Sequence, residues 1–160
     1  YDYEGELALV IGRPARHVPA ADALQYVAGY TVFMDGSVRD FQRHTSQFIP
    51  GKNFPASGSA GPWLVTTDEI PDPAALSLET RVNGEVLQSA PVGDLCITVP
   101  EIVAYCSTFC ELRPGDIIAT GTPSGVGFAR KPPRWLVPGD VVEVEISRIG
   151  TLRNPVAPEA

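Results

Sequence analysis

Short β-prone segments joined by glycine- and proline-rich turns recur along the whole chain. The clearest pair covers residues 77–82 and 85–89, and the Asn83-Gly84 step between them supplies the positive φ angles of a type I′ hairpin turn. Pro-Gly-Asp turns at residues 114–116 and 138–140 each precede another β-prone run. This spacing predicts a mainly β fold with a few short helices, in which the strands form a roll or sandwich without parallel crossover units.

Apolar and β-branched runs mark the other strands that we expect, at residues 7–11, 30–34, 63–66, 117–120 and 141–146. Two segments predict helices. The first covers residues 18–26 and would be closed by Gly29. The longer one covers residues 99–109, with Pro100 in its first turn and four apolar residues on one side, Ile102, Val103, Cys106 and Phe109. Residues 49–61 predict a loop, because they are rich in Gly, Pro and Ser.

Length and charge limit the class of protein. The 160 residues suffice for one domain, which we place at 1–160, and a net charge of −7 argues against a nucleic-acid partner. No apolar run reaches membrane-spanning length, so no membrane partner is expected. Three cysteines suit a reducing compartment, which predicts a cytoplasmic protein in which Cys106 and Cys110 are core thiols. Because the chain starts at Tyr1 in the run-up to a strand, we expect natural residues upstream of it.

Two carboxylates open the first predicted strand, separated by one small residue. Side chains alternate along a strand, so Glu4 and Glu6 point to the same side. Neighbouring like charges are costly unless a positive charge lies between them, and Mg²⁺, Mn²⁺ and Ca²⁺ are bound by carboxylate oxygens. The pattern predicts half of a metal site. An acidic strand end in solvent stays open as the alternative, because Glu-x-Glu is short and common.

Several segments together resemble one family, the fumarylacetoacetate hydrolase superfamily, in its catalytic C-terminal domain. Each is weak alone, but they follow the family's order over nearly the whole chain. They include Tyr-Glu-Gly-Glu-Leu-Ala at residues 3–8 and Thr-Gly-Thr-Pro-x-Gly-Val-Gly at 120–127. The other matching segments are residues 29–35, 39–42, 51–54, 61–63, 82–85, 114–116 and 150–156.

The resemblance implies a mixed β-roll fold and a homodimer. It also implies a Mg²⁺ or Mn²⁺ ion, which Ca²⁺ can replace in crystals, held by Glu4, Glu6 and Asp35. Asp35 ends a separate predicted strand, which can bring a third carboxylate beside the first two. Its alternative role is to form the turn before Gly36. Gly36 is smaller than the residue expected at that position, so this turn is expected to be looser.

Substrate-binding residues also follow from the resemblance. The substrates of the family are mostly 2-oxo acids, which chelate the metal through the carboxylate and keto oxygens. By resemblance, Lys52 places a cation against the developing enolate or the substrate carboxylate, Arg39 and Gln42 hold substrate or metal-bound water, and Gly121 and Thr122 bind the substrate carboxylate. From residue type alone, a solvated Lys52, an Arg39–Asp40 ion pair and a plain turn over residues 121–127 are the alternatives.

Three reactions pass through such an enolate, so the resemblance leaves the reaction partly open. We expect a metal-dependent hydrolase that cleaves a C–C bond of a 2-oxo or 2,4-dioxo acid. The alternatives are an isomerase or decarboxylase of an unsaturated 2-hydroxy/2-oxo dicarboxylate from aromatic-acid breakdown, and an oxaloacetate decarboxylase. A non-catalytic metal-binding protein and a β-domain with a structural calcium ion are further alternatives.

Hydrolytic family members carry a His–Glu pair on a lid segment upstream of this domain, and that segment is expected to be missing from the present sequence. The chain has two histidines, His17 and His44. We do not expect either of them to replace the pair.

Overall fold

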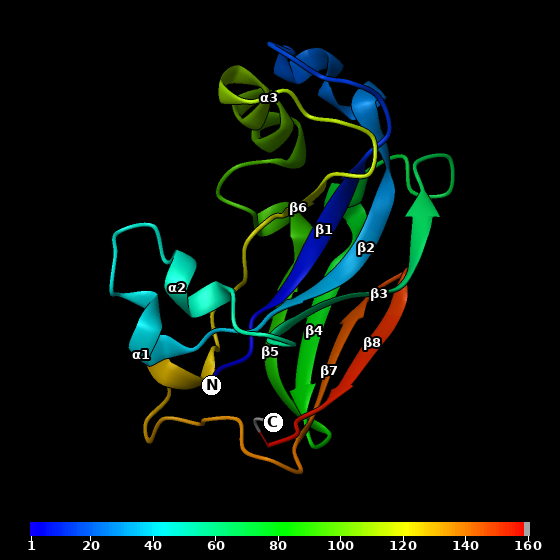
Figure 1. Cartoon of the computed structure of the whole chain (residues 1–160). Coiled ribbons are helices and arrows are strands. Elements are labelled where there is room, and N and C mark those ends of the chain that lie inside the picture. Colours follow the sequence, from blue (N-terminus) through cyan, green and yellow to red (C-terminus); the bar gives the residue numbers. More distant parts are fainter. Residues whose placement is uncertain (159–160) are drawn as a thin grey trace.

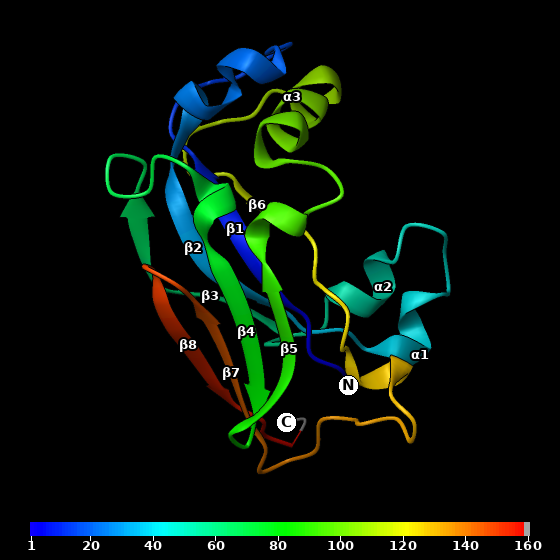
Figure 2. The same ribbon diagram turned by 180° about the vertical axis from the view of Figure 1, so that it is seen from behind.

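Two four-stranded antiparallel sheets form the body of the protein in the computed structural model, which describes residues 1–158 (Figure 1). The first sheet has the order β3 (Gly58–Thr66), β2 (Val27–Asp35), β1 (Gly5–Ile11) and β6 (Ile117–Ala119). The second has the order β5 (Glu85–Pro91), β4 (Ser77–Val82), β7 (Val141–Ile146) and β8 (Gly150–Pro155), and Figure 2 shows it from behind the first sheet. All strand pairs among the described residues are antiparallel, which confirms the predicted class.

The core lies between the two sheets. Leu7 and Leu9 of β1 and Val142 and Val144 of β7 are each at most 1% exposed. The sheets approach closely at Gly5, where an added Cβ would overlap the hydroxyl of Thr80. Because side chains alternate along β1, this contact directs Gly5 and Leu7 into the core and turns their neighbours to the outer face of the first sheet.

The predicted helix at residues 99–109 is confirmed as α3 (Val99–Phe109). The Glu101 carboxylate accepts the Thr98 N–H at 2.8 Å, and Pro100 occupies the first turn, so the sequence fixes where the helix begins. Its predicted apolar side is only partly buried: Val103 is 0% exposed, whereas Phe109 is 65% exposed. Figures 1 and 2 show α3 beside the 3₁₀ helix η1 (Ala20–Tyr26) at one end of the sheets.

The structure differs from the predicted elements in three places. Gly29 does not close the first helix but lies inside β2, where its Cα meets the Val65 carbonyl too closely for a side chain. The predicted loop at residues 49–61 contains α2 (Ile49–Lys52) and the start of β3. The strand β8 was not predicted.

The short α1 (Arg39–Gln42) and α2 lie together, because Gly51 packs against Gln42 and its carbonyl accepts the Val38 N–H at 2.9 Å.

Other predictions have mixed outcomes. The Asn83-Gly84 hairpin is confirmed, with φ angles of 53° and 83°. The prediction of core thiols is wrong for Cys110, which is exposed just after α3, whereas Cys106 is half-buried. No helix in residues 1–158 combines the length and apolar character needed to cross a membrane. Three short 3₁₀ turns complete the described elements, η2 (Pro73–Ala75), η3 (Val92–Asp94) and η4 (Gly127–Ala129).

Candidate metal centre

Three carboxylates meet where β1 begins and β2 ends. Glu4 directly precedes β1, Glu6 is its second residue, and Asp35 is the last residue of β2. The backbone joins the two strand ends, because the Asp35 N–H donates to the Glu4 carbonyl at 2.8 Å. One oxygen from each of the three carboxylates lies within 4.8 Å of the others. The structure thus brings together the three residues that the resemblance named as metal ligands.

Burial makes this cluster electrostatically demanding. Burial is the largest cause that raises the pKa of Glu6, and together with the nearby charges of Asp35 and Glu4 it raises this pKa from 4.5 to about 7. The Gly121 N–H donates to Glu6 Oε2 at 2.7 Å and opposes the shift. The site holds three acidic groups closer than they would stay in water without a cation between them.

Two basic side chains reach the cluster from the α1–α2 segment. Lys52 Nζ lies 2.6 Å from Glu4 Oε2 and also pairs with Asp35, and Arg39 Nη1 lies 2.5 Å from Glu4 Oε1. Burial lowers the pKa of Lys52, but the hydrogen bonds to Asp35 and Glu4 outweigh it and raise that pKa above 10.5, so Lys52 is an ammonium at neutral pH. Arg39 Nη1 also donates to Gln42 Oε1 at 3.0 Å.

These contacts rule out two of the alternatives. Lys52 is bound to carboxylates and is not a freely solvated side chain. The ion pairs of Arg39 in the described chain go to Glu4 and Asp2 and not to Asp40, which is exposed.

The glycine-rich loop after β6 is fastened to β1. The Thr120 N–H and hydroxyl both donate to the Leu7 carbonyl, and the Thr122 hydroxyl donates to the Gly5 carbonyl at 2.9 Å. Gln88 completes this arrangement: its Nε2 donates to Thr122 Oγ1 at 2.8 Å, and its Oε1 accepts the Gly5 N–H at 3.0 Å. The loop therefore lies beside Glu6 as a fixed part of the site, and it is not a plain turn.

Sequence reasoning missed two buried residues of this region, Gln88 and Asp2, which are 1% and 0% exposed. Asp2 carries a signal that was available, because Asp2, Glu4 and Glu6 continue one alternation along the chain. Gln88 carries none. It lies on the second sheet, and only the folded structure brings its amide to β1.

The turn at Gly36 is tight, which corrects the expectation of a looser one. Gly36 is buried, and an added Cβ would overlap the Ser57 carbonyl and the hydroxyl of Tyr1. Glycine is needed for this close packing directly after Asp35. Both histidines are exposed: His17 lies beside Arg16, and the ring of His44 packs on Phe41 with centroids 4.8 Å apart.

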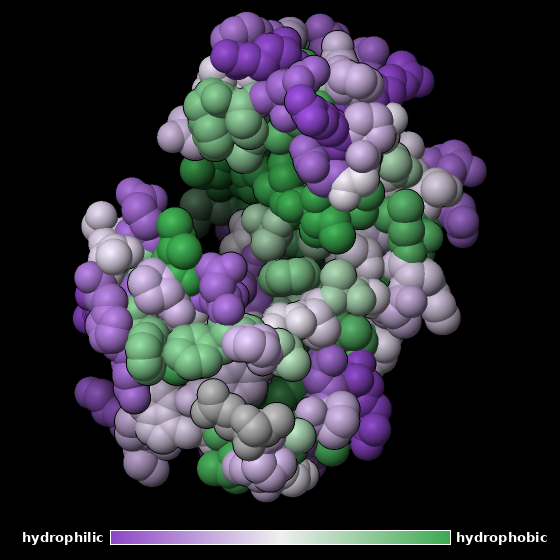
Figure 3. All heavy atoms as spheres, in the orientation of Figure 1, coloured by the Kyte–Doolittle hydropathy of each residue, from purple (hydrophilic) through white to green (hydrophobic). Residues whose placement is uncertain are grey.

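Apolar side chains continue from the carboxylates along the outer face of the first sheet. Glu6 is paired across the strands with Phe33, Ala8 with Ala119, and Val10 with Ile117. Figure 3 shows hydrophobic side chains gathered across the middle of this side of the molecule, between the end that carries α3 and the end that carries α1 and α2. The carboxylates thus form the charged end of the candidate site, and an apolar surface of the first sheet adjoins it.

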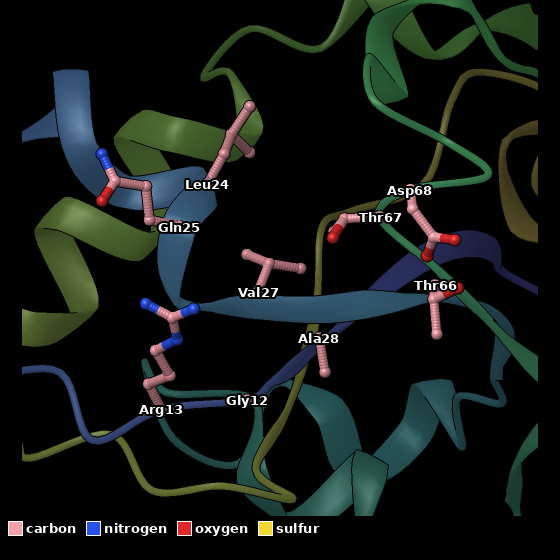
Figure 4. Close-up of a pocket in the computed structure, with 9 residues that line it drawn as sticks. All are labelled: Gly12, Arg13, Leu24, Gln25, Val27, Ala28, Thr66, Thr67 and Asp68. Carbon is pink, nitrogen blue, oxygen red and sulfur yellow. The ribbon is translucent and has the colours of Figure 1, made fainter.

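A polar hollow of about 510 Å³ lies at the opposite end of the β1–β2 pair (Figure 4). Arg13 and Gln25 line it on one side, and Thr67 and Asp68 lie on the other. Residues 6 and 12 are separated by about 20 Å along an extended strand, so this hollow is separate from the carboxylate cluster.

Comparison with known proteins identifies the family. Residues 1–157 match the family model described as fumarylacetoacetate (FAA) hydrolase, C-terminal. The chain belongs to this family. The resemblance found in the sequence is thereby confirmed, together with its fold.

Relatives of known name differ in the reaction that they catalyse. Over 156 residues the chain is 46% identical to the mitochondrial oxaloacetate tautomerase Fahd2a of Rattus norvegicus, covering 97% of this chain and 50% of that protein. It resembles the crystal structure of 2-hydroxyhepta-2,4-diene-1,7-dioate isomerase from Mycobacterium marinum with a TM-score of 0.88 and 44% identity, over 98% of this chain and 58% of that one.

A third relative was solved with ligands. It is fumarylpyruvate hydrolase from Pseudomonas aeruginosa in complex with Mn²⁺ and pyruvate, with a TM-score of 0.89 and 33% identity, covering 99% of this chain and 66% of that chain. The present chain spans about half the length of the curated relatives that it matches. The family thus includes hydrolases and isomerases, and family membership alone leaves both reactions open.

Proposed function

We propose that this protein is a divalent-metal-dependent hydrolase that cleaves a C–C bond of a 2-oxo or 2,4-dioxo acid. The observation that carries the proposal is the cluster of Glu4, Glu6 and Asp35, within 4.8 Å of one another, with Lys52 held against it. The fumarylpyruvate hydrolase complex with Mn²⁺ and pyruvate supports both the metal and the substrate class.

The donor set fits the proposed ion. All three side chains offer carboxylate oxygens, which suit hard cations such as Mg²⁺ and Mn²⁺. Burial and then the charges of Asp35 and Glu4 raise the pKa of Glu6, so a further cation among the carboxylates would be favourable. Glu4, Glu6 and Asp35 would hold the ion. When bound, it would act as a Lewis acid on a chelated 2-oxo acid and stabilise negative charge on the keto oxygen.

Lys52 supplies positive charge from the protein itself. Cleavage of an acylpyruvate adds the oxygen of water to the acyl carbonyl and breaks the bond to the pyruvate methylene carbon. The electron pair of that bond moves onto pyruvate as its enolate, and one proton of the water is finally balanced by protonation of the methylene carbon, which gives a carboxylic acid and pyruvate. A protonated Lys52 beside Glu4 and Asp35 would stabilise this charge and hold a proton for the enolate. Arg39 and Gln42, which are bound to each other, would orient the charged end of the substrate or its water.

The loop after β6 would bind the substrate carboxylate through its main chain. The hydroxyl proton of Thr122 is directed to the Gly5 carbonyl, and the Gly121 N–H is directed to Glu6. The Thr122 N–H is the remaining donor of this pair of residues. The adjacent face with Phe33 and Ala119 would contact the uncharged part of the substrate.

Isomerisation is the second candidate. The tautomerase and isomerase relatives support it, because moving a proton within an enolisable 2-oxo acid uses the same cation and the same Lys52 without water addition. Decarboxylation of oxaloacetate forms the same enolate. A non-catalytic protein would have no need for Lys52 to contact the carboxylates.

We also propose a homodimer and a cytoplasmic location. Large exposed apolar side chains, among them Tyr105 and Phe109 of α3, support burial against a second copy, and three free cysteines support a reducing compartment. Light scattering of the purified protein tests the dimer.

Turnover of a small substrate panel tests the reaction. The protein, with its natural flanking sequence, would be assayed on an acylpyruvate, oxaloacetate and an unsaturated 2-hydroxydienedioate, with Mn²⁺ or Mg²⁺ and with EDTA. We expect metal-dependent release of pyruvate from the acylpyruvate. Isomerisation or CO₂ release alone would establish the second candidate, and no turnover with any substrate would refute the enzymatic proposal.

A further inference from the structure

Asp2 is the most completely buried carboxylate near the site, at 0% exposure. It lies outside the three-carboxylate cluster and has donors on every side. The N–H groups of Tyr3, Gly127 and Phe128 donate to it at 2.9, 2.7 and 3.0 Å. Arg39 Nε donates to Asp2 Oδ2 at 2.9 Å, and Arg39 Nη2 lies 2.8 Å from the same oxygen. Donors on both of its oxygens hold this carboxylate in one orientation.

Arg39 connects Asp2 to the candidate metal ligand Glu4. One edge of its guanidinium faces Asp2, while Nη1 lies 2.5 Å from Glu4 Oε1. The group is also stacked over the ring of Phe128, 4.6 Å from the centroid, and only 11% of the side chain is exposed. Because the guanidinium is planar, the contact with Asp2 determines which nitrogen reaches Glu4.

Charge gives Asp2 a second effect on the site. Four carboxylates and two cations are linked by these contacts: Asp2, Glu4, Glu6, Asp35, Arg39 and Lys52. When all are ionised, four negative and two positive charges leave −2, which one divalent cation would neutralise. Without Asp2, the balance is −1, and Glu4 is left to compensate the charge of Arg39 as well as to bind the cation.

We propose that Asp2 is a positioning residue for the metal centre: it neutralises and orients Arg39, so that Arg39 holds Glu4 by one oxygen and does not compete with the cation. This inference rests on the proposed function. It assigns Asp2 no contact with substrate or metal. Its effect on Glu4 is exerted through Arg39.

Mn²⁺ titration of Asp2→Asn tests the proposal, with bound Mn²⁺ followed by electron paramagnetic resonance. Asparagine keeps the size of the side chain but turns an amide toward donors and removes the charge. We expect the Mn²⁺ affinity to fall roughly tenfold to hundredfold, as for other residues that orient metal ligands. An unchanged affinity in a folded variant would overturn the proposal.

Asp140 supplies a matched control. It too is a buried aspartate that pairs with an arginine, Arg134, at 2.8 Å, and accepts a main-chain N–H, from Val137, at 2.9 Å. Asp140 takes no part in the charged cluster. We expect Asp140→Asn to lower the midpoint of thermal unfolding while the Mn²⁺ affinity stays within about twofold of the wild-type value. Equal losses of affinity in the two variants would show that Asp2 acts only by stabilising the fold.

A second comparison tests the route through Arg39. In an Arg39→Gln background, Asp2→Asn should change the Mn²⁺ affinity by less than about twofold. A full loss in that background would contradict the proposed route. If Asp2→Asn fails to fold, Arg39→Lys tests the same link, because a lysine cannot contact Asp2, Glu4 and Gln42 together. Wild-type protein that binds no Mn²⁺ would refute the proposed function itself, which separates the two failures.

Discussion

The chain contains two Glu-x-Glu pairs with opposite fates. Glu4 and Glu6 lie at the start of β1, and Glu143 and Glu145 lie on β7. In both pairs the alternation of the strand places the two carboxylates on one face. The first pair is buried against a third carboxylate, whereas the side chains of Glu143 and Glu145 are 28% and 44% exposed.

The neighbouring strands cause the difference. Glu145 Oε2 accepts from Arg81 of β4 at 2.7 Å, and Glu143 lies 3.4 Å from Arg153 of β8, so each carboxylate on β7 meets a cation in partial solvent. The end of β2 instead brings Asp35 to Glu4. The residue on the neighbouring strand therefore decides whether a Glu-x-Glu pair is a candidate metal site. The pair on β7 is an acidic strand in contact with solvent, which is the alternative that the sequence left open for Glu4 and Glu6.

Removing one carboxylate from each pair gives the largest contrast. Glu6→Ala should abolish Mn²⁺ binding and turnover yet leave the protein folded, because the buried carboxylate that it removes has a raised pKa and the apolar half of β1 is intact. Isothermal titration with Mn²⁺ and circular dichroism measure both. Glu145→Ala, the matched control, should retain binding and lose at most about 1 kcal/mol of stability. Full activity in Glu6→Ala would refute the site.

Substituting each of the two lysines of the chain extends this comparison to the rate of catalysis. Lys52→Met should lower kcat roughly hundredfold with Mn²⁺ binding retained, because it removes positive charge from the developing enolate and takes no ligand from the ion. Steady-state kinetics at saturating Mn²⁺ measure the effect. Lys131→Met should behave as wild type, since Lys131 is exposed. A kcat that is equal in both variants would remove Lys52 from the chemistry.

Thr122 tests the loop that distinguishes β1 from β7. Thr122→Val leaves the Gly5 carbonyl and the Gln88 amide short of a partner, which should cost about 1–3 kcal/mol of stability. The main-chain N–H would be less well placed, and KM should rise roughly tenfold. Thr122→Ser keeps the hydroxyl and should restore both values. An unaltered KM in Thr122→Val would count against substrate binding by this loop.

The smallest effect on the site is expected at the entry to β7, where Asp140 acts structurally. The hydrogen bond from Arg134 is the largest cause that lowers the pKa of Asp140, and with those from Val137 and Asn83 it outweighs burial and brings this pKa to about 2. Since the folded-state pKa lies below the usual 3.8, this stability is present above pH 4 and is lost as the pH falls toward 2.

Chemical unfolding at several pH values measures this contribution. The free-energy difference between wild type and Asp140→Asn should shrink by about 2 kcal/mol from pH 5 to pH 2. A difference that is independent of pH would contradict this account of the Asp140 charge.

Local sequence predicted those elements whose cause is local. The hairpin follows from Asn83-Gly84, and α3 follows from Pro100 and its apolar spacing. The helix α2 was missed because its Gly51 is held by contact with Gln42, and residue propensities give no sign of such a contact. The start of β3 was missed for a similar reason, because residues 58–61 are rich in glycine and form a strand only by pairing with β2.

The candidate site shows the same division. Alternation identified Glu4 and Glu6, and the family resemblance added Asp35 and Lys52, which the structure brings to them. The contact of Gln88 with Gly5 and the pairing of Arg39 with Asp2 could not be predicted, because they join residues 83 and 37 positions apart. Only the folded chain determines which polar groups lie together there.

The position of Gln88 has a consequence for local opening of the protein. Its amide, on β5 of the second sheet, holds the Gly5 N–H of β1 and the loop at Thr122. We therefore expect the Gly5 amide hydrogen to be protected from solvent exchange by a residue of the opposite layer, and to exchange when the two layers separate. A ligand held by the carboxylates would stabilise the joined layers, so it would slow amide exchange in β5, a strand that contributes no carboxylate to the site.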